Sequence, residues 1–312
     1  MSTTTAPQKR VSSPRRRPRA GAEARSGWLF SAPTAIITVA IIVVPIIWNI
    51  VLATRDVSFL EIAREGIFAG TFSLQAFVDT ITGAGFWRSL WITIVYSVAS
   101  TAGSILLGLI AALVFRGAFP GRGPLRALML LPYVAPVVAV AFVWQVMLNP
   151  QYGVLNHYLV KLPGISEPID FLGLAPWALI SVIAFEIWRY FPFAFLFLSA
   201  RVVALPRDIE EASLIDGATP SQNFWHVVLP QLMNTVALLS VLRLIMTFNK
   251  FDDVYLLTGG AAGTEVAAVR VYNQLMGSFD IPGAAATAVV LAIVLALFLT
   301  GYFSLTSRRD DS

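Results

Sequence analysis

Six long apolar segments constrain this chain most strongly. They run over residues 27–54, 89–115, 127–149, 177–200, 235–258 and 281–304. A helix needs about 20 apolar residues to cross a hydrocarbon core of about 30 Å, and each segment meets that length. Only 13% of the residues are charged, against about 25% in soluble domains, which is too little to cover a water-facing surface. The sequence therefore predicts an all-α integral membrane protein with six transmembrane helices.

The segment that begins at residue 27 is predicted to be a retained first helix over 27–54. Its apolar run is longer than the core of about 7–15 residues found in signal peptides, and no A-x-A cleavage site follows it. Pro45 within it predicts a kink. A transmembrane domain is thus expected over 27–307, with the remaining five helices in a core over 85–307.

The two ends of the chain are predicted to be tails. Residues 1–26 are basic and rich in Ser, Thr and Pro, so they cannot bury enough apolar surface to fold alone. They are interpreted either as a disordered cytoplasmic tail that sets orientation and is attracted to anionic lipid, or as a nucleic-acid-binding or regulatory arm. Residues 308–312 are expected to be a short cytoplasmic C-terminal tail.

Basic residues indicate the orientation, because Lys and Arg accumulate on the cytoplasmic side of a membrane. Six spans place both termini on one side. If that side is the cytoplasm, fourteen Lys and Arg residues lie inside. Six lie outside: Arg55, Arg64, Arg88, Lys161, Lys250 and Arg270. We therefore expect a multi-pass protein of a bacterial plasma membrane with both termini cytoplasmic.

The sequence lacks the residues that several kinds of catalytic, metal-binding and nucleotide-binding site require. The chain has no Cys, and its two histidines are His157 and His226, so neither a thiolate site nor a histidine-rich metal site is predicted. The sequence holds neither the phosphate-binding G-x-x-x-x-G-K-[ST] pattern nor the H-E-x-x-H and G-x-S-x-G motifs. A membrane-embedded enzyme or redox subunit is thus a remote alternative, and no cofactor is expected.

A polar segment at 205–230 lies between two apolar spans and is predicted to contain a short helix with well-defined ends. Pro206 suits the start of a helix, and Gly217 can adopt the left-handed conformation that ends one. Small residues within it would allow close approach of a partner's backbone. The segment is interpreted as a helix that docks in a groove of another subunit or, alternatively, as an amphipathic connector in the membrane interface.

This segment carries a resemblance that extends over most of the chain. From Glu211, E-A-S-L-I-D-G followed by V-V-L-P is similar to E-A-A-x-x-x-G-x9-I-x-L-P, with Ser213 and Val227 as the departures. Further matching pieces are residues 131–136, 188–193 and 251–260, although Ala261-Ala262 replaces the usual Gly-Pro. The chain resembles the permease subunits of type I ABC importers of the maltose-type, carbohydrate-uptake group.

That resemblance implies a non-enzymatic transport subunit in a larger complex. The expected partners are a second permease, two cytoplasmic ATP-binding subunits that hydrolyse ATP, and an external solute-binding protein. The loop at 205–230 is then the coupling loop, which docks in a groove of the ATPase. Its expected coupling residues are Glu210, Glu211, Ala212, Ser213, Asp216, Gly217 and Ala218.

The resemblance also implies a sugar path. Its expected residues are Tyr133, Val137, Glu186, Trp188, Arg189, Phe193, Asn249, Asp252 and Asp253. Charged groups inside a span are costly and need water or a partner. Glu186 and Arg189, three residues apart, share a helix face and form either a structural pair or part of a wet site. Asn249, Asp252 and Asp253 recur at helical spacing and are expected to face one cavity.

The substrate is left open between two classes. Carboxylates and amides suit the hydroxyls of a mono- or oligosaccharide such as trehalose or a maltose-like sugar. Val137 lacks the hydroxyl of the maltose protein, and Glu186 and Asp252 carry charge in place of amides, which argues against maltose itself. The alternative is glycerol-3-phosphate or a related polyol ester, whose phosphate Arg189 and Lys250 could bind. Arg243 is interpreted as structural or gating.

Overall fold

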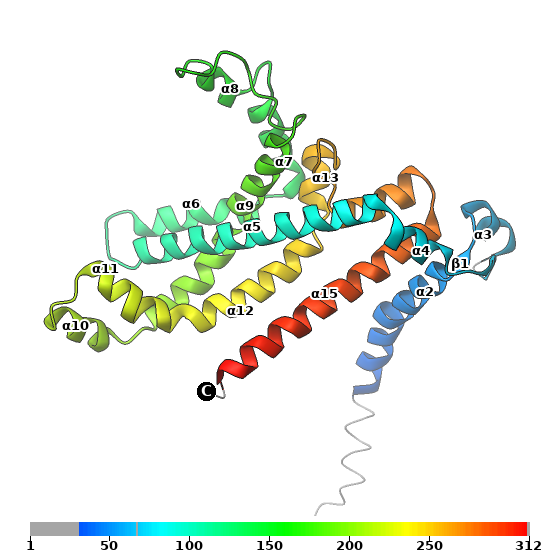
Figure 1. The fold of residues 1–312 in the computed structure, drawn as a ribbon. Coiled ribbons are helices and arrows are strands. Elements are labelled where there is room, and N and C mark those ends of the chain that lie inside the picture. The colour runs from blue at the N-terminus through cyan, green and yellow to red at the C-terminus, as the bar shows by residue number, and fades with distance from the viewer. Residues whose placement is uncertain (1–30, 67, 311–312) are drawn as a thin grey trace, which may run out of the picture. The chain divides into compact units, whose positions relative to one another are not determined.

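The computed structural model describes residues 31–66 and 68–310, and within them five helices are long and apolar enough to cross a membrane. They span Ser31–Ala53, Ala84–Val114, Trp177–Val203, Pro220–Phe248 and Ile281–Tyr302, and a bent helix pair over Arg122–Leu148 raises the number to six if it counts as one span. The all-α membrane architecture is confirmed (Figure 1). The predicted tail at 1–26 and the first residues of the first span lie outside the described residues.

The first span contains a widened turn at the proline. A π-helical turn, η1 (Val39–Val43), leads directly into α2 (Val44–Ala53). Pro45 has no N–H for the carbonyl four residues earlier and its ring crowds that position, so the preceding turn opens. The apolar side chains of this span are largely exposed, as expected of a helix that faces lipid or a neighbouring subunit.

A short segment with two strands and two helices connects the first two spans. Strand β1 (Arg55–Asp56) pairs antiparallel with β2 (Thr71–Phe72), α3 (Phe59–Glu65) lies between them in sequence, and α4 (Gln75–Thr82) follows. Ser58 and Glu61 form a capping box at the start of α3. The backbone N–H of Ser58 donates to the Glu61 carboxylate and lowers its pKa.

Helices α5 (Ala84–Val114) and α9 (Trp177–Val203) pack closely along their length. A Cβ added to Gly103 would lie 2.3 Å from Ile187 Cδ1, and one added to Gly108 would lie 2.7 Å from Ala194 Cβ. Small residues at these positions let the two backbones approach, which is a common basis of helix packing in membranes. This tight pair forms the frame on which the polar site is built.

The third span is bent, which corrects the prediction of one continuous helix over 127–149. Helices α6 (Arg122–Val134) and α7 (Val137–Leu148) meet at 95°. The break falls at Ala135, whose extended backbone (ψ 144°) precedes Pro136. A residue before proline is pushed out of the helical region by the proline ring. The short helix α8 (Val154–Leu159) follows.

The fifth predicted span, 235–258, is also interrupted. After α10 (Arg207–Ile215), α11 (Pro220–Asn223) and the π-helical η2 (Phe224–Val228), helix α12 (Leu229–Phe248) ends, and a separate helix α13 (Asp252–Thr258) begins after three residues. Asp252 and Asp253 thus occupy the first turn of α13, where the helix dipole favours negative charge. Asn249 and the two aspartates therefore do not share one helix face, contrary to the sequence-based expectation.

The chain ends with α14 (Ala267–Tyr272), the π-helical η3 (Asn273–Gly277) and α15 (Ile281–Asp310). Helix α15 continues past the expected boundary of the transmembrane domain at residue 307. The short tail predicted over 308–312 is therefore helical through Asp310, and its last two residues lie outside the described part.

Candidate functional site

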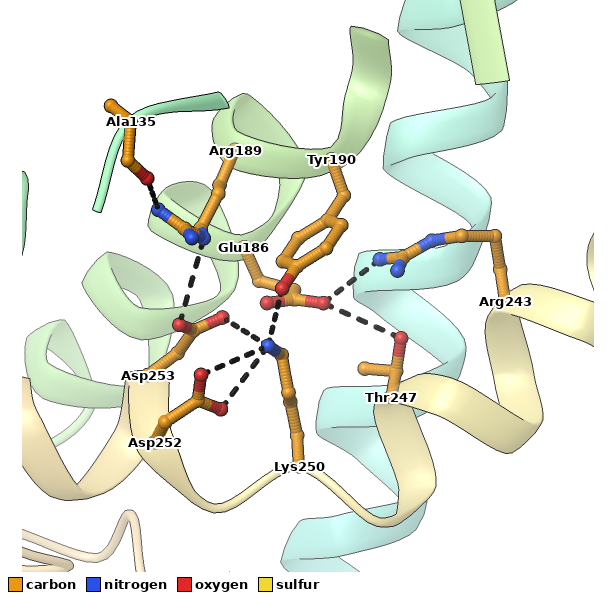
Figure 2. A network of polar contacts seen from close by, with 9 residues as sticks. All are labelled: Ala135, Glu186, Arg189, Tyr190, Arg243, Thr247, Lys250, Asp252 and Asp253. Atoms are coloured by element: carbon orange, nitrogen blue, oxygen red, sulfur yellow. Dashed lines mark hydrogen bonds and ion pairs between the residues drawn. The ribbon is translucent and has the colours of Figure 1, made fainter. Parts of the chain in front are cut away.

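A buried network of charged side chains joins α9, α12 and α13 (Figure 2). At its inner end, Arg243 Nη2 donates to Glu186 Oε1 over 2.8 Å, and both side chains are fully buried. Thr247 Oγ1 lies 3.5 Å from the same carboxylate oxygen. Glu186 therefore has its partner on α12, 57 positions along the chain, and the predicted Glu186–Arg189 pair is not the one that forms.

Tyr190 lies at the centre of this network, one helical turn after Glu186. Lys250 Nζ donates to its hydroxyl. The Arg243 guanidinium carbon lies 4.3 Å from the centre of its ring and Lys250 Nζ lies 4.5 Å from it, within the range of cation–π attraction. Tyr190 is not among the path residues predicted from the sequence, although its position four residues after Glu186 on the same face could have indicated it.

Two neighbouring aspartates also belong to the network, and their side chains differ in solvent exposure. Lys250 Nζ lies 3.1 Å from Asp252 Oδ1 and 3.3 Å from Asp253 Oδ2. Arg189 Nε lies 3.9 Å from Asp253 Oδ1, and Arg189 Nη1 donates to the Ala135 carbonyl. The Asp253 side chain is fully buried, whereas that of Asp252 is 43% exposed. Burial of Glu186 and Asp253 differs from the expectation that both line a water-filled cavity.

The charges in this network balance, because three cations meet three carboxylates. Lys250 belongs to it, and its side chain is largely buried. The Arg189 contact to Ala135 also ties α9 to the break in the third span. The network thus holds together the two interrupted spans, at the positions where each has lost helical hydrogen bonds.

The remaining predicted path residues divide into two groups. The Tyr133 ring lies 5.7 Å from that of Tyr190 and 5.9 Å from that of Phe193, so these aromatics adjoin the network. Trp188 packs instead against Trp144. Asn249 is exposed, and its amide donates to the Ile245 carbonyl on its own helix. Val137 begins α7, half-buried.

The predicted coupling helix is present as α10, and its end is well defined. Gly217 adopts φ +87°, the Gly217 N–H donates to the Leu214 carbonyl, and the Ala218 N–H donates to the Ser213 carbonyl. This is the Schellman arrangement that ends a helix at glycine. Nothing lies within 4 Å of a Cβ built at Gly217, so the glycine is required by its backbone conformation.

The side chains of the predicted coupling residues differ in exposure and in their contacts. Glu211, Ala212 and Asp216 are exposed, and Ile215 next to them is 85% exposed. Glu210, by contrast, is bound within the chain, because Arg116 Nη1 and Nη2 each donate to one of its carboxylate oxygens over 2.6 Å. These bonds raise the pKa of Arg116. Glu210 therefore does not offer a free carboxylate to another subunit.

Comparison with known proteins identifies the family. Residues 104–309 match the family described as "Binding-protein-dependent transport system inner membrane component". The chain belongs to this family. It is 34% identical over 269 residues to the inner membrane ABC transporter permease protein YcjO of Escherichia coli K12, which covers 86% of this chain and 89% of that protein.

Other relatives extend over most of the chain. The trehalose/maltose transport system permease protein MalF of Thermococcus litoralis is 31% identical, over 93% of this chain and 96% of that protein. The sn-glycerol-3-phosphate transport system permease protein UgpA of Agrobacterium fabrum is 30% identical, over 90% and 94%. One chain of a bacterial importer of the acidic polysaccharide alginate matches the fold with a TM-score of 0.77 at 21% identity, over 93% of this chain and 99% of that one.

Membership of this family establishes the type of protein. The chain is a multi-pass inner membrane permease, a transport subunit of an ABC importer that works with a solute-binding protein. The resemblance drawn from the Glu211 motif is thus confirmed, and so is the interpretation of the chain as a non-enzymatic subunit.

Proposed function

We propose that this permease carries a sugar from an external solute-binding protein into the cytoplasm. The charge-balanced network around Tyr190 carries the proposal. Each of its cations contacts a carboxylate of the same chain, which leaves the part-exposed Asp252 carboxylate and the aromatic rings for a neutral, hydroxylated solute. The similarity to a trehalose/maltose permease over 93% of the chain supports the same substrate class.

Glycerol-3-phosphate is the second candidate, because UgpA is similar over 90% of the chain. A phosphate site needs cations that are not already neutralised. Here Arg189 contacts Asp253, and Lys250 contacts both Asp252 and Asp253. Binding a phosphate would place its charge beside those carboxylates, with an unfavourable electrostatic cost in a low-dielectric setting. This arrangement favours the sugar.

The decisive measurement is uptake into proteoliposomes that contain the complete importer and its binding protein. Labelled trehalose, maltose and glycerol-3-phosphate would be compared, each with ATP inside or outside the vesicle. ATP-dependent uptake of a sugar without uptake of glycerol-3-phosphate is the expected result. The reverse selectivity would contradict the sugar assignment.

Within this function, we assign the substrate path to the aromatic and carboxylate residues predicted from the sequence. Tyr133, Phe193 and Asp252 are the members that best suit contact with a solute. The Tyr133 ring packs against those of Tyr190 and Phe193, and Asp252 is the part-exposed carboxylate of the network. Val137, Trp188 and Asn249 are retained as path residues in a conformation other than this one. Glu186, Arg189 and Asp253 support the path by holding α9, α12 and α13 together.

The two adjacent aspartates provide a matched test. Asp252→Ala removes a half-exposed carboxylate, so we expect sugar uptake to fall about tenfold or more while complex yield stays normal. Asp253→Ala removes a fully buried carboxylate between Arg189 and Lys250. Lys250 keeps its contact to Asp252, but Arg189 loses its carboxylate, and breaking a buried pair costs about 3–5 kcal/mol. Complex yield should therefore fall. Normal uptake in Asp252→Ala at normal yield would remove that residue from the path.

The complex itself is proposed to contain a second permease subunit and two ATP-binding subunits. Support comes from the apolar side chains that α10 exposes, Ile209, Leu214 and Ile215, beside the exposed polar residues Glu211 and Asp216. A small apolar surface rimmed by charge is typical of a docking site for another protein. The ATPase would bind there, and closure of the two ATPases would move the permeases between their inward-facing and outward-facing states.

We further infer that both termini face the cytoplasm, which puts α10 on the side of the ATPases. The Cys-free chain makes this directly measurable. Cysteine introduced at Ser166, which is exposed in the outer loop, should react with an impermeant maleimide added to intact cells. Cysteine at Ser213 should react only after the membrane is opened and the protein denatured. The opposite labelling pattern would contradict this orientation.

A further inference from the structure

The coupling helix is attached to the transmembrane core through the chain at both of its ends and through one ion pair. At its start, the turn Ala204–Pro206 connects it to α9, and Leu205 in that turn is buried. At its end, the chain continues through α11 and η2 into α12. The ion pair is the two-bond contact between Arg116 and Glu210, at the cytoplasmic end of α5. This pair adds a contact to a third span, α5, and so further restrains the direction of the short helix.

The Arg116 attachment has its own support. Arg126 on α6 donates through Nη2 to the Phe115 carbonyl over 3.0 Å, which fixes the turn that carries Arg116. The Phe115 ring packs at 5.7 Å from that of Phe195 on α9. Arg116 and Glu210 have side-chain exposures of 26% and 12%, and a two-pronged guanidinium–carboxylate pair with limited exposure is stronger and more directional than a surface pair.

Helix α5 connects this cytoplasmic attachment to the outer loops. Near its outer end Ser89 Oγ donates to Glu265 Oε2, and Thr93 Oγ1 accepts from the Ala267 N–H. Between these ends, α5 packs against α9, and the absence of a side chain at Gly108 lets the two backbones approach closely. A displacement of α10 therefore reaches α9, which carries Glu186 and Arg189 of the buried network.

We propose that Arg116 and Glu210 are positioning residues that lock the coupling helix to α5, so that movement of the ATPase is delivered to α5 and α9 as a rigid rotation. The inference rests on the proposed ATPase docking at α10. It also reassigns Glu210, which acts inside the permease, while Glu211 and its exposed neighbours face the other subunit.

The test measures coupling in proteoliposomes that contain the complete importer. Arg116→Ala and Glu210→Ala should each lower the amount of sugar transported per ATP hydrolysed about tenfold, which corresponds to about 1.4 kcal/mol of lost coupling free energy. Arg116→Lys keeps the charge but loses the second hydrogen bond, so its coupling should be intermediate. The exchanged pair, Arg116→Glu with Glu210→Arg, should restore coupling.

Two further measurements separate the possible causes of such a loss: the yield of assembled complex and the ATP hydrolysis stimulated by the binding protein. Yield of the assembled complex separates loss of coupling from loss of folding, since a merely structural pair would lower yield and leave the ratio of sugar to ATP unchanged. Single variants with wild-type ratios would overturn the proposal. So would an exchanged pair that assembles normally and stays uncoupled, because Glu210 would then act on the ATPase itself. Failure of the wild-type complex to transport any sugar would count against the proposed function instead, since binding-protein-stimulated ATP hydrolysis would still report the coupling.

Discussion

Glu186→Ala should sharply reduce the amount of folded, assembled permease. The substitution leaves Arg243 as a fully buried guanidinium without its carboxylate, because both side chains have no exposed surface and lie 2.8 Å apart. Breaking a buried pair by removing one partner costs about 3–5 kcal/mol, a large part of the stability of a typical domain. Yield in membranes and the midpoint of thermal unfolding in detergent would measure the effect.

Two comparison variants show whether the loss of yield comes from the unpaired buried charge. Glu186→Gln combined with Arg243→Met removes both charges together, and replacing a whole buried pair is often neutral, so yield should largely recover. Glu167→Ala removes an exposed carboxylate of the loop between α8 and α9 and should change stability by about 0.5 kcal/mol or less. Normal yield and unfolding temperature in Glu186→Ala would mean that Arg243 finds another partner and that the pair is dispensable.

Gly217→Val should abolish the stimulation of ATP hydrolysis by the binding protein. Gly217 holds φ +87° at the end of α10, a conformation that a β-branched residue adopts only with strain of about 1–3 kcal/mol. Relief of that strain would undo the two terminal hydrogen bonds of the helix and redirect the exposed Leu214 and Ile215. We expect complex assembly with the ATPase to weaken in the same variant, as measured by co-purification.

Gly66 provides the matched control for this substitution. It ends α3, between the first two spans, with φ +88°, and like Gly217 it has nothing within 4 Å of an added Cβ. Gly66→Val therefore also places a β-branched residue at a positive-φ helix end, on the opposite side of the predicted topology, and stimulation of the ATPase should persist. If both variants lose stimulation equally, general destabilisation is responsible and α10 has no special part in coupling.

Much of the architecture was predictable from the sequence, because hydropathy and helix-capping signals are local. The lengths of the apolar segments predicted the spans, and Pro206 and Gly217 predicted the limits of the polar helix, which begins at Arg207 and ends before Gly217. The Glu211 motif identified the family. Each of these inferences depends on residues within about one span of each other, where steric and solvation rules act without the rest of the fold.

The interruptions of the third and fifth spans were only partly visible. Pro136 was a clear signal for the 95° bend, yet proline also occurs within continuous membrane helices, as Pro192 does in α9. The break between Phe248 and Asp252 has no proline or glycine to mark it. It persists because Lys250, from within the break, is held by the Tyr190 hydroxyl and by the two aspartates of α13.

Partner choice among the charged residues was decided by the tertiary structure alone. The spacing of Glu186 and Arg189 correctly placed both on one face of α9, but that face meets α12 near Glu186 and α13 near Arg189. Glu186 thus pairs with Arg243 and Arg189 with Asp253. Likewise, Glu210 and Glu211 are adjacent carboxylates in the sequence, and only the approach of the end of α5 turns one inward to Arg116 while the other stays exposed. The sequence determined which residues are costly to bury, and the packing of distant helices decided which opposite charge compensates each one.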